Sequence, residues 1–309
     1  MENSHAPQIG FGLPQVFPEG AIDIRHIQAV SQAAEDLGLH SLWVQEQVLG
    51  RANVLEALSL LTYVAAITSS IRLGVAVLVL PQYHPVLLAK QISTLDHLSQ
   101  GRAIIGIGLG GHSAVLQAAR VSEGGRVRRF SESLQVMKQL WTLPATSLDG
   151  RFFFLENAAM EPKPIQRPHP PIWFGGRHLN ALRRAVRYGA GWMGSGASTL
   201  EDFKASANQV KEYLAEARVA PASFTISKRV YLAIDANTSR AEQRLRAWFT
   251  HYYGNPELVT RVCIIGDGAF CQHKLQDLVE AGARHLLLSP LFDRLEHLEQ
   301  LGKILPGLA

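Results

Sequence analysis

The chain has 309 residues, of which 47% are hydrophobic and 18% charged, so it can form a large core and does not resemble a disordered polymer. Its net charge of +4 is dispersed apart from Arg126, Arg128 and Arg129, which argues against a nucleic-acid-binding protein. No apolar run reaches the roughly 18–20 residues that span a bilayer, and no signal peptide is recognisable. We therefore expect a cytoplasmic protein without nucleic-acid or membrane partners.

The predicted elements alternate between strands and helices along the chain. The predicted strand and helix pairs are 9–13 with 24–37, 40–44 with 55–68, 71–80 with 85–99, 103–109 with 130–141, 172–174 with 179–188, 191–193 with 200–218, 225–234 with 241–253, and 285–288 with 295–305. A further helix is predicted at 271–281. Eight such units predict an α/β fold, a closed (β/α)8 TIM barrel, with 1–309 as one domain. A doubly wound open sheet is the alternative, but no dinucleotide fingerprint follows the first strand.

Three segments interrupt this alternation, at about 111–127, 144–170 and 254–270. The second contains a predicted small hairpin at 151–155 and ends in a proline-rich stretch. Strand and helix units resume directly after each segment. We therefore interpret all three as insertions into the barrel rather than as linkers between domains.

In a barrel of this kind, functional groups come from the C-terminal ends of the strands and the loops that follow them. Gln45, Glu46 and Gln47 follow the second predicted strand, where they could hydrogen-bond a heterocycle or take part in proton transfer; a solvated strand end is the alternative. Gly108 and Gly110 follow the fourth strand and would let a ring or phosphate lie against the backbone, unless they only form a tight turn. His112, in the same loop, is a candidate polar group or simply a solvated side chain.

Two further glycine-containing loops follow the next two strands. Gly175, Gly176 and Arg177 lead directly into a helix, and free amides at a helix N-terminus favour anions. Gly194, Ser195 and Gly196 form the second loop, which also precedes a helix. Two such loops in succession predict a phosphate site.

Other chemistry finds little support in the sequence. The chain has no Gly-x-Ser-x-Gly, His-Glu-x-x-His or Walker motif, and no lysine stands at a predicted strand end, which argues against a Schiff-base mechanism. Cys263 and Cys271 lack partners at zinc-site spacing, so we expect reduced thiols and no metal site.

A series of short motifs runs along nearly the whole chain. The motifs are Ile71-Arg-Leu-Gly-Val-Ala-Val-Leu-Val-Leu-Pro81, His84-Pro85, Gly101-Arg102, Pro162-Lys-Pro164, Pro170-Pro-Ile-Trp-Phe-Gly-Gly176, Gly189-Ala-Gly191-Trp192 and Glu280-Ala-Gly282. In this order they resemble the luciferase-like monooxygenase family, and most closely its branch of deazaflavin-dependent oxidoreductases.

This resemblance implies a barrel, often a homodimer, that binds reduced FMN or the deazaflavin coenzyme F-420 at the strand ends. Val77, Leu78 and Val79 would lie along the cofactor ring, near a bulge that often contains a cis non-proline peptide in this family. Gly175 and Gly176, with residues 194–196, would hold the cofactor phosphate. The resemblance also allows a separate flavin reductase as a partner.

The chain departs from the family at one position that matters for proton transfer. Glu46-Gln47 stands where the family commonly has Asp-His, and glutamine cannot titrate. Proton transfer would then use Glu46, His112 or a substrate group. The sequence predicts a flavin- or deazaflavin-dependent oxidoreductase or monooxygenase acting on a small organic substrate. The alternatives are a cofactor-binding paralogue without redox activity and a cofactor-free lyase or isomerase of phosphorylated substrates.

Overall fold

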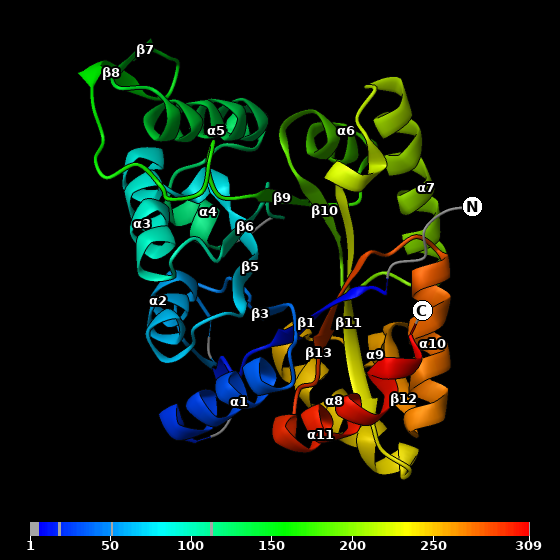
Figure 1. Ribbon diagram of the computed structural model, residues 1–309. Coiled ribbons are helices and arrows are strands. Elements are labelled where there is room, and N and C mark those ends of the chain that lie inside the picture. The colour runs from blue at the N-terminus through cyan, green and yellow to red at the C-terminus, as the bar shows by residue number, and fades with distance from the viewer. Residues whose placement is uncertain (1–5, 18–19, 51, 112–113, 309) are drawn as a thin grey trace.

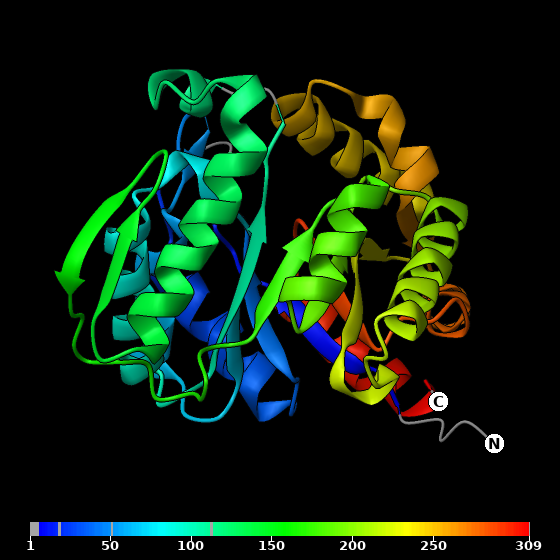
Figure 2. The same ribbon diagram turned by 90° about the horizontal axis from the view of Figure 1, so that it is seen from above.

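The computed structural model describes residues 6–17, 20–50, 52–111 and 114–308, and its central feature is a closed ring of parallel strands with helices on the outside (Figures 1 and 2). Around the ring the strands follow the order β1 (Gln8–Gly12), β3 (Ser41–Val44), β5 (Arg72–Val79), β6 (Ala103–Gly108), β9 (Ile172–Gly175), β10 (Gly191–Gly194), β11 (Thr225–Ile234) and β13 (His285–Ser289). Pairing of β13 with β1, and of β10 with β11, closes the ring. The predicted (β/α)8 barrel is confirmed.

The helices that cover the barrel lie close to their predicted ranges. They are α1 (Ile24–Asp36), α2 (Ala57–Ile67), α3 (Pro85–Leu98), α5 (Arg126–Thr142), α6 (Leu179–Tyr188), α7 (Leu200–Glu216), α8 (Thr238–Tyr253), α10 (Gly268–Glu280) and α11 (Arg294–Ile304). Three of them begin three or more residues earlier than predicted, α5 by one turn and α8 and α10 by three residues each. For α8 the reason is a cap, because the Asn237 side chain accepts a hydrogen bond from the Arg240 amide at 3.0 Å.

The segment 254–270, predicted to be irregular, contains a strand that the sequence analysis missed. It holds a short helix, α9 (Val259–Val262), and then β12 (Cys263–Gly266), which pairs in parallel with residues 231–234 of β11. The strand β11 is longer than its ring neighbours, which pair only with its residues 225–231. The end of β11 therefore has a free edge, and β12 satisfies its backbone groups.

The other two insertions are also partly regular. The helix α4 (Ala114–Ala118) lies within 111–127, and β7 (Thr146–Asp149) pairs antiparallel with β8 (Phe154–Ala158) within 144–170. The hairpin predicted at 151–155 is real but wrongly placed, because residues 150–153 form its turn. The Glu132 carboxylate accepts hydrogen bonds from the amides of Arg151, Phe152 and Phe153 at 3.1, 2.8 and 2.8 Å, which stabilises that turn. A second small antiparallel sheet joins β2 (Val16–Phe17) to β4 (Asn53–Val54).

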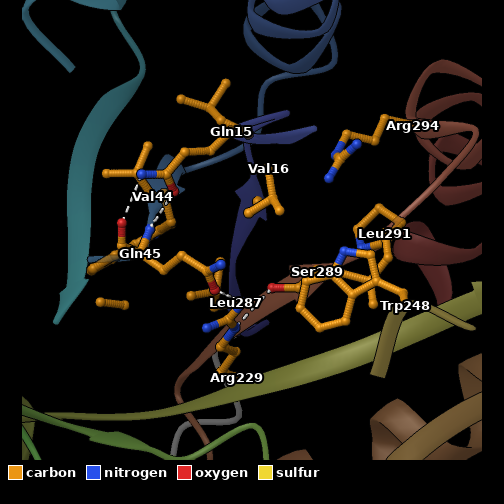
Figure 3. Close-up of a pocket in the computed structure, with 15 residues that line it drawn as sticks. Gln15, Val16, Val44, Gln45, Arg229, Trp248, Leu287, Ser289, Leu291 and Arg294 are labelled. Carbon is orange, nitrogen blue, oxygen red and sulfur yellow. Dashed lines mark hydrogen bonds between the residues drawn. The ribbon is translucent and has the colours of Figure 1, made fainter. Parts of the chain in front are cut away.

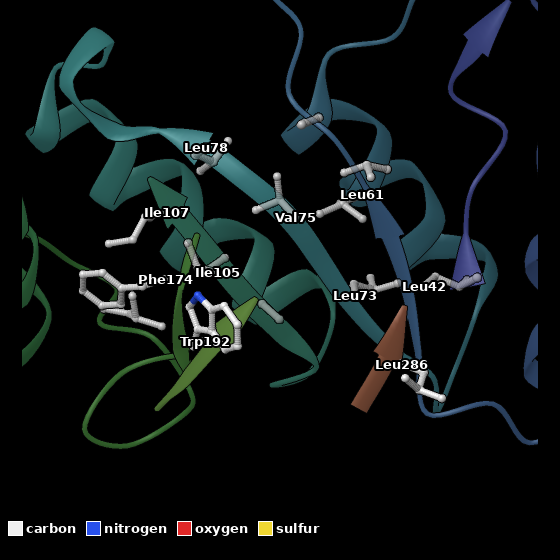
Figure 4. Packing of buried hydrophobic residues seen from close by; sticks show 14 of the residues in the cluster. Leu42, Leu61, Leu73, Val75, Leu78, Ile105, Ile107, Phe174, Trp192 and Leu286 are labelled. Atoms are coloured by element: carbon white, nitrogen blue, oxygen red, sulfur yellow. The ribbon is translucent and has the colours of Figure 1, made fainter. Parts of the chain in front are cut away.

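Continuous apolar runs form the core, as expected for parallel strands covered on both faces. Figure 4 shows Leu73, Val75 and Leu78 of β5 packed beside Ile105 and Ile107 of β6, and all five are fully buried. Burial of each such side chain contributes about 1.5–3 kcal/mol relative to exposure.

The residues that the structure describes include neither a membrane-spanning helix nor a metal-binding cluster. No helix there has the length and hydropathy needed to cross a bilayer. Within the same ranges, no cluster of three or more His, Cys, Asp or Glu side chains is arranged to hold a metal ion. Cys263 and Cys271 are both free thiols.

One carboxylate connects α1 to the start of β5. The Glu35 side chain accepts hydrogen bonds from the backbone amides of Ser69, Ser70 and Ile71 at 2.9, 2.6 and 2.9 Å. Partial burial alone would raise its pKa, but these donors outweigh burial and lower the pKa to about 2.

We expect Glu35→Gln to lower the free energy of unfolding at neutral pH by about 1–2 kcal/mol, because hydrogen bonds to a charged acceptor are lost. The pKa of Glu35 is lower in the folded than in the unfolded state, so its stabilising effect is complete above pH 4.5 and is lost as the pH falls toward 2. Urea unfolding across this range should therefore show a weaker pH dependence in the variant. Asp36→Asn, which alters the exposed neighbour, is the control; an equal effect of both changes would contradict the assignment.

Candidate active site

A cavity of about 740 Å³, called the mouth cavity below, opens at the C-terminal ends of the strands. Its walls come from the ends of β5, β6, β9 and β10, from Arg229 within β11, and from α5, α6 and α8. The volume lies within the range of about 300–1,000 Å³ that is usual for small-molecule and cofactor sites. This is the face of the barrel at which functional groups were predicted.

A bulge in β5 forms one wall of this cavity. Val75 pairs with Ile105 and Leu78 with Ile107, so Ala76 and Val77 together lie opposite a single residue of β6. The peptide bond between Ala76 and Val77 is cis. The bulge and cis peptide expected from the family resemblance are therefore confirmed, and the Val77 side chain lines the cavity.

Neighbouring glycines make room for Val77. A Cβ atom on Gly108 would lie 2.9 Å from a Val77 methyl group, and one on Gly175 would lie 3.0 Å from it. Both glycines were predicted as cofactor-binding residues, and both line the cavity. In the structure itself, these two glycines allow the Val77 side chain to pack between β6 and β9.

The other two residues predicted to lie along the ring are placed differently. Leu78 is fully buried in the core and its side chain does not line the cavity. Strand alternation resumes after the bulge and turns this side chain away from the cavity. Val79 does not line the cavity; it packs against Gly110, which has φ +67° and whose added Cβ would lie 2.5 Å from a Val79 methyl group.

The two predicted phosphate loops meet in the cavity because β9 and β10 are neighbours in the ring. Gly175, Gly176 and Arg177 line it on one side, and residues 194–196 line it on the other. Gly176 has φ +138°, a conformation that L side chains rarely adopt. His178 caps α6, with Nδ1 accepting a hydrogen bond from the Asn180 amide at 3.2 Å.

Positive charge dominates the lining of the mouth cavity. Arg126, Arg177, Arg184 and Arg229 contribute to it, and none of the described residues that line it is Asp or Glu. Uncompensated arginines beside a helix N-terminus favour a phosphate or another anion. Of these four arginines, the sequence analysis predicted only Arg177 as a cofactor-binding residue. The sequence did offer one indication for Arg229, since a charged residue in the middle of a predicted buried strand suggests a functional role.

Lys228 holds the loop at 195–198, the second predicted phosphate loop, and the sequence analysis did not predict this role. Its Nζ donates to the Ser195 carbonyl, to the Ser198 carbonyl at 3.0 Å and to Ser198 Oγ at 2.9 Å. The side chain is only 4% exposed, and burial lowers its pKa to about 7. It stands within β11 rather than at a strand end, but its side chain is long enough to reach the loop.

Neither Glu46 nor Gln47, two of the three predicted catalytic residues, lines the mouth cavity. Glu46 lies outside the mouth cavity, where it accepts hydrogen bonds from the Val79 amide at 2.8 Å, from Gln82 Nε2 at 2.6 Å and from the Tyr83 hydroxyl. Burial raises its pKa although these donors oppose the shift. Gln47 is half-buried, lines no part of the cavity, and its Oε1 has no partner within the described residues. His112 lies outside those residues.

Comparison with known proteins agrees with the fold. The model of a family described as luciferase-like monooxygenase matches residues 9–257. A solved F-420-dependent secondary alcohol dehydrogenase superposes with a TM-score of 0.85 at 18% identity, covering 99% of this chain and 100% of the other.

Curated relatives match over part of their length. An uncharacterised protein of Mycobacterium tuberculosis is 38% identical over 131 residues, which is 42% of this chain and 46% of the relative. The FMNH2-dependent dimethylsulfone monooxygenase of Pseudomonas putida is 28% identical, covering 61% and 53%. The F-420-dependent glucose-6-phosphate dehydrogenase of Kineococcus radiotolerans is 27% identical, covering 70% and 66%. The chain thus spans about half the length of the first of these relatives.

We expect Lys228→Met to loosen the loop at 195–198, because the substitution removes the Nζ group that donates to the carbonyls of Ser195 and Ser198. Amide hydrogen exchange at Ala197 and Ser198 should accelerate by roughly tenfold, since each lost hydrogen bond is worth about 1 kcal/mol. Lys204→Met, at an exposed position on α7, should leave this exchange unchanged. Equal protection of the loop in both variants would show that Lys228 does not hold it.

Proposed function

Because the chain belongs to the luciferase-like monooxygenase family, we propose that it is an oxidoreductase that binds reduced FMN or coenzyme F-420 in the mouth cavity. The observation that carries this proposal is the combination of four lining arginines, no described acidic lining residue and two glycine loops beside the β5 bulge. One curated relative is named for FMNH2 and another for F-420, so both cofactors stay in the proposal. The substrate would be a small organic molecule.

The cavity residues fit such a cofactor in two ways. Arg177 and Arg184, with the first turn of α6, would neutralise its phosphate, because charge-assisted hydrogen bonds to arginine are among the strongest in proteins. Val77 would offer an apolar surface to its ring. The bound cofactor would supply the redox chemistry, while the chain would position the reactants and keep water away.

Glu46 has a positioning role in this proposal. Its two carboxylate oxygens hold the Val79 amide and the side chains of Gln82 and Tyr83, so they fix the end of β5 just after the bulge. This arrangement favours Glu46 as a support for Val77 rather than as a proton donor at the ring.

A second candidate function is cofactor binding without redox catalysis. The observation that favours it is that neither Glu46 nor Gln47 lines the mouth cavity. A chain of this kind would still bind the cofactor but would not reoxidise it in response to any substrate.

Three further features of the proposal come from the family resemblance. We expect a homodimer, a cytoplasmic location and, where FMN is the cofactor, a separate flavin reductase that supplies it in reduced form. Analytical ultracentrifugation would decide the first of these directly.

The test is binding of FMN and of coenzyme F-420, each oxidised and reduced, followed by fluorescence and anaerobic titration. We expect one reduced cofactor to bind, and Arg184→Ala to weaken its binding by roughly 10–100-fold, because a charge-assisted contact of about 1.5–3 kcal/mol is lost.

Arg187→Ala is the matched control, since Arg187 lies on the same helix but does not line the cavity. It should change the affinity little. Binding of neither cofactor to folded protein would overturn the proposal. Binding without substrate-dependent reoxidation would select the second candidate.

A further inference from the structure

A second and much smaller cavity, called the inner cavity below, lies beside the mouth cavity (Figure 3). Its volume is about 30 Å³, and it is formed mainly at the ends of β1, β3 and β13. Polar side chains in its lining are those of Gln15, Gln45, Arg229, Ser289 and Arg294. Ala76 and Arg229 line both cavities, so the inner cavity adjoins the place where the β5 bulge begins.

Arg294 is the unusual member of this lining. It is the first residue of α11 and is 8% exposed, yet its Nε has no hydrogen-bond partner in residues 6–17, 20–50, 52–111 or 114–308. Figure 3 shows its guanidinium pointing from α11 toward Val16, with no hydrogen bond drawn to the other lining residues. The adjacent Asp293 does not neutralise it, because that carboxylate pairs with Arg244.

This arginine is charged under ordinary conditions. Burial lowers its pKa to about 10, which still leaves it protonated at neutral pH. A buried guanidinium whose Nε has no partner is unfavourable, since the hydration that this group loses is not replaced. Such a group is consistent with a site whose missing partner is an anionic ligand.

The surrounding polar groups are already held in place. Arg229 donates from Nη2 to Gln45 Oε1 at 2.8 Å and from Nε to Ser289 Oγ at 3.3 Å. Gln15 in turn accepts from the Gln45 amide at 2.8 Å and donates to the Gln45 and Leu55 carbonyls, both at 2.7 Å. The wall opposite a ligand is therefore ordered before the ligand arrives.

We propose that the inner cavity binds a carboxylate through Arg294, and that the substrate is a small organic acid. This inference rests on the proposed function, because it assigns the acid as the partner of the cofactor in the mouth cavity. Guanidinium groups match the planar geometry of a carboxylate. The volume of about 30 Å³ suits one or two waters or a carboxylate head group. The remainder of the acid would extend past Ala76 into the mouth cavity.

The test uses butyrate as a probe and butyramide as its neutral counterpart, each titrated against the full-length protein by ligand-detected NMR at constant ionic strength. We expect butyrate to bind the wild type and Arg294→Met to weaken this binding by about thirtyfold, as for loss of one partner of a buried charged pair. Arg294→Lys should retain part of the affinity, because it keeps the charge but not the planar group. Butyramide should bind the wild type and Arg294→Met equally.

A thermal melt without ligand gives a second readout. Arg294→Met should raise the melting temperature, because it removes an unpaired buried charge and keeps an apolar stem of similar length. Equal butyrate affinity in the wild type and Arg294→Met would overturn the proposal, as would equal binding of butyrate and butyramide to the wild type. Cofactor binding is measured on the same samples. If the protein binds butyrate but neither cofactor, the proposed function is refuted. If it binds a cofactor but not butyrate, only the carboxylate site is refuted.

Discussion

The packing of Val77 between β6 and β9 is the constraint on which the mouth of the barrel depends. The bulge places this side chain where the neighbouring strands can have no side chains of their own, at Gly108 and Gly175. Gly106 is equally constrained, since a Cβ there would lie 2.1 Å from the Val75 carbonyl oxygen. Glu46 then holds the strand just beyond the bulge through the Val79 amide. One local irregularity thus determines both the apolar wall of the cavity and the backbone that surrounds it.

Charge is distributed very differently at the two ends of this wall. On the side of β9 and β10, arginines and a helix N-terminus face open space, where water can hydrate them in the absence of a ligand. On the side of β1 and β13, Arg294 is almost fully buried and lines the inner cavity of about 30 Å³. The first arrangement costs little free energy without a ligand, because water hydrates the arginines. The second would destabilise the folded chain unless the proposed anion is bound.

Much of the fold followed from local sequence patterns. The aliphatic runs at 71–80 and 103–109 are strands buried on both faces, and the glycine loops after β9 and β10 do meet, because consecutive strands of a barrel are neighbours. The strand β12 was missed because it lies outside the ring of eight strands, and its partner is the overhanging end of β11. The burial of Leu78 away from the mouth cavity could not be read from the sequence, because the bulge changes which side chains of β5 face the cavity.

The site was harder to predict than the fold, for a physical reason. Arg126, Arg184 and Arg229 come from two helices and a strand that are far apart in sequence, and only the closed ring brings them to one cavity. The motif residues Glu46 and Gln47 lie beside that cavity instead of in it. A resemblance of motifs predicted the face of the barrel at which the mouth cavity opens, but it could not say which side chains line that cavity.

Arg229 lines both cavities, so the two proposed ligands would not bind independently. A cofactor that draws this guanidinium toward the mouth cavity, or neutralises it, would change the affinity of the inner cavity for an acid. Thermodynamic linkage requires the acid to change the affinity for the cofactor by the same factor. A single side chain fixed by Gln45 and Ser289 would thereby make the affinity for each molecule depend on whether the other is already bound.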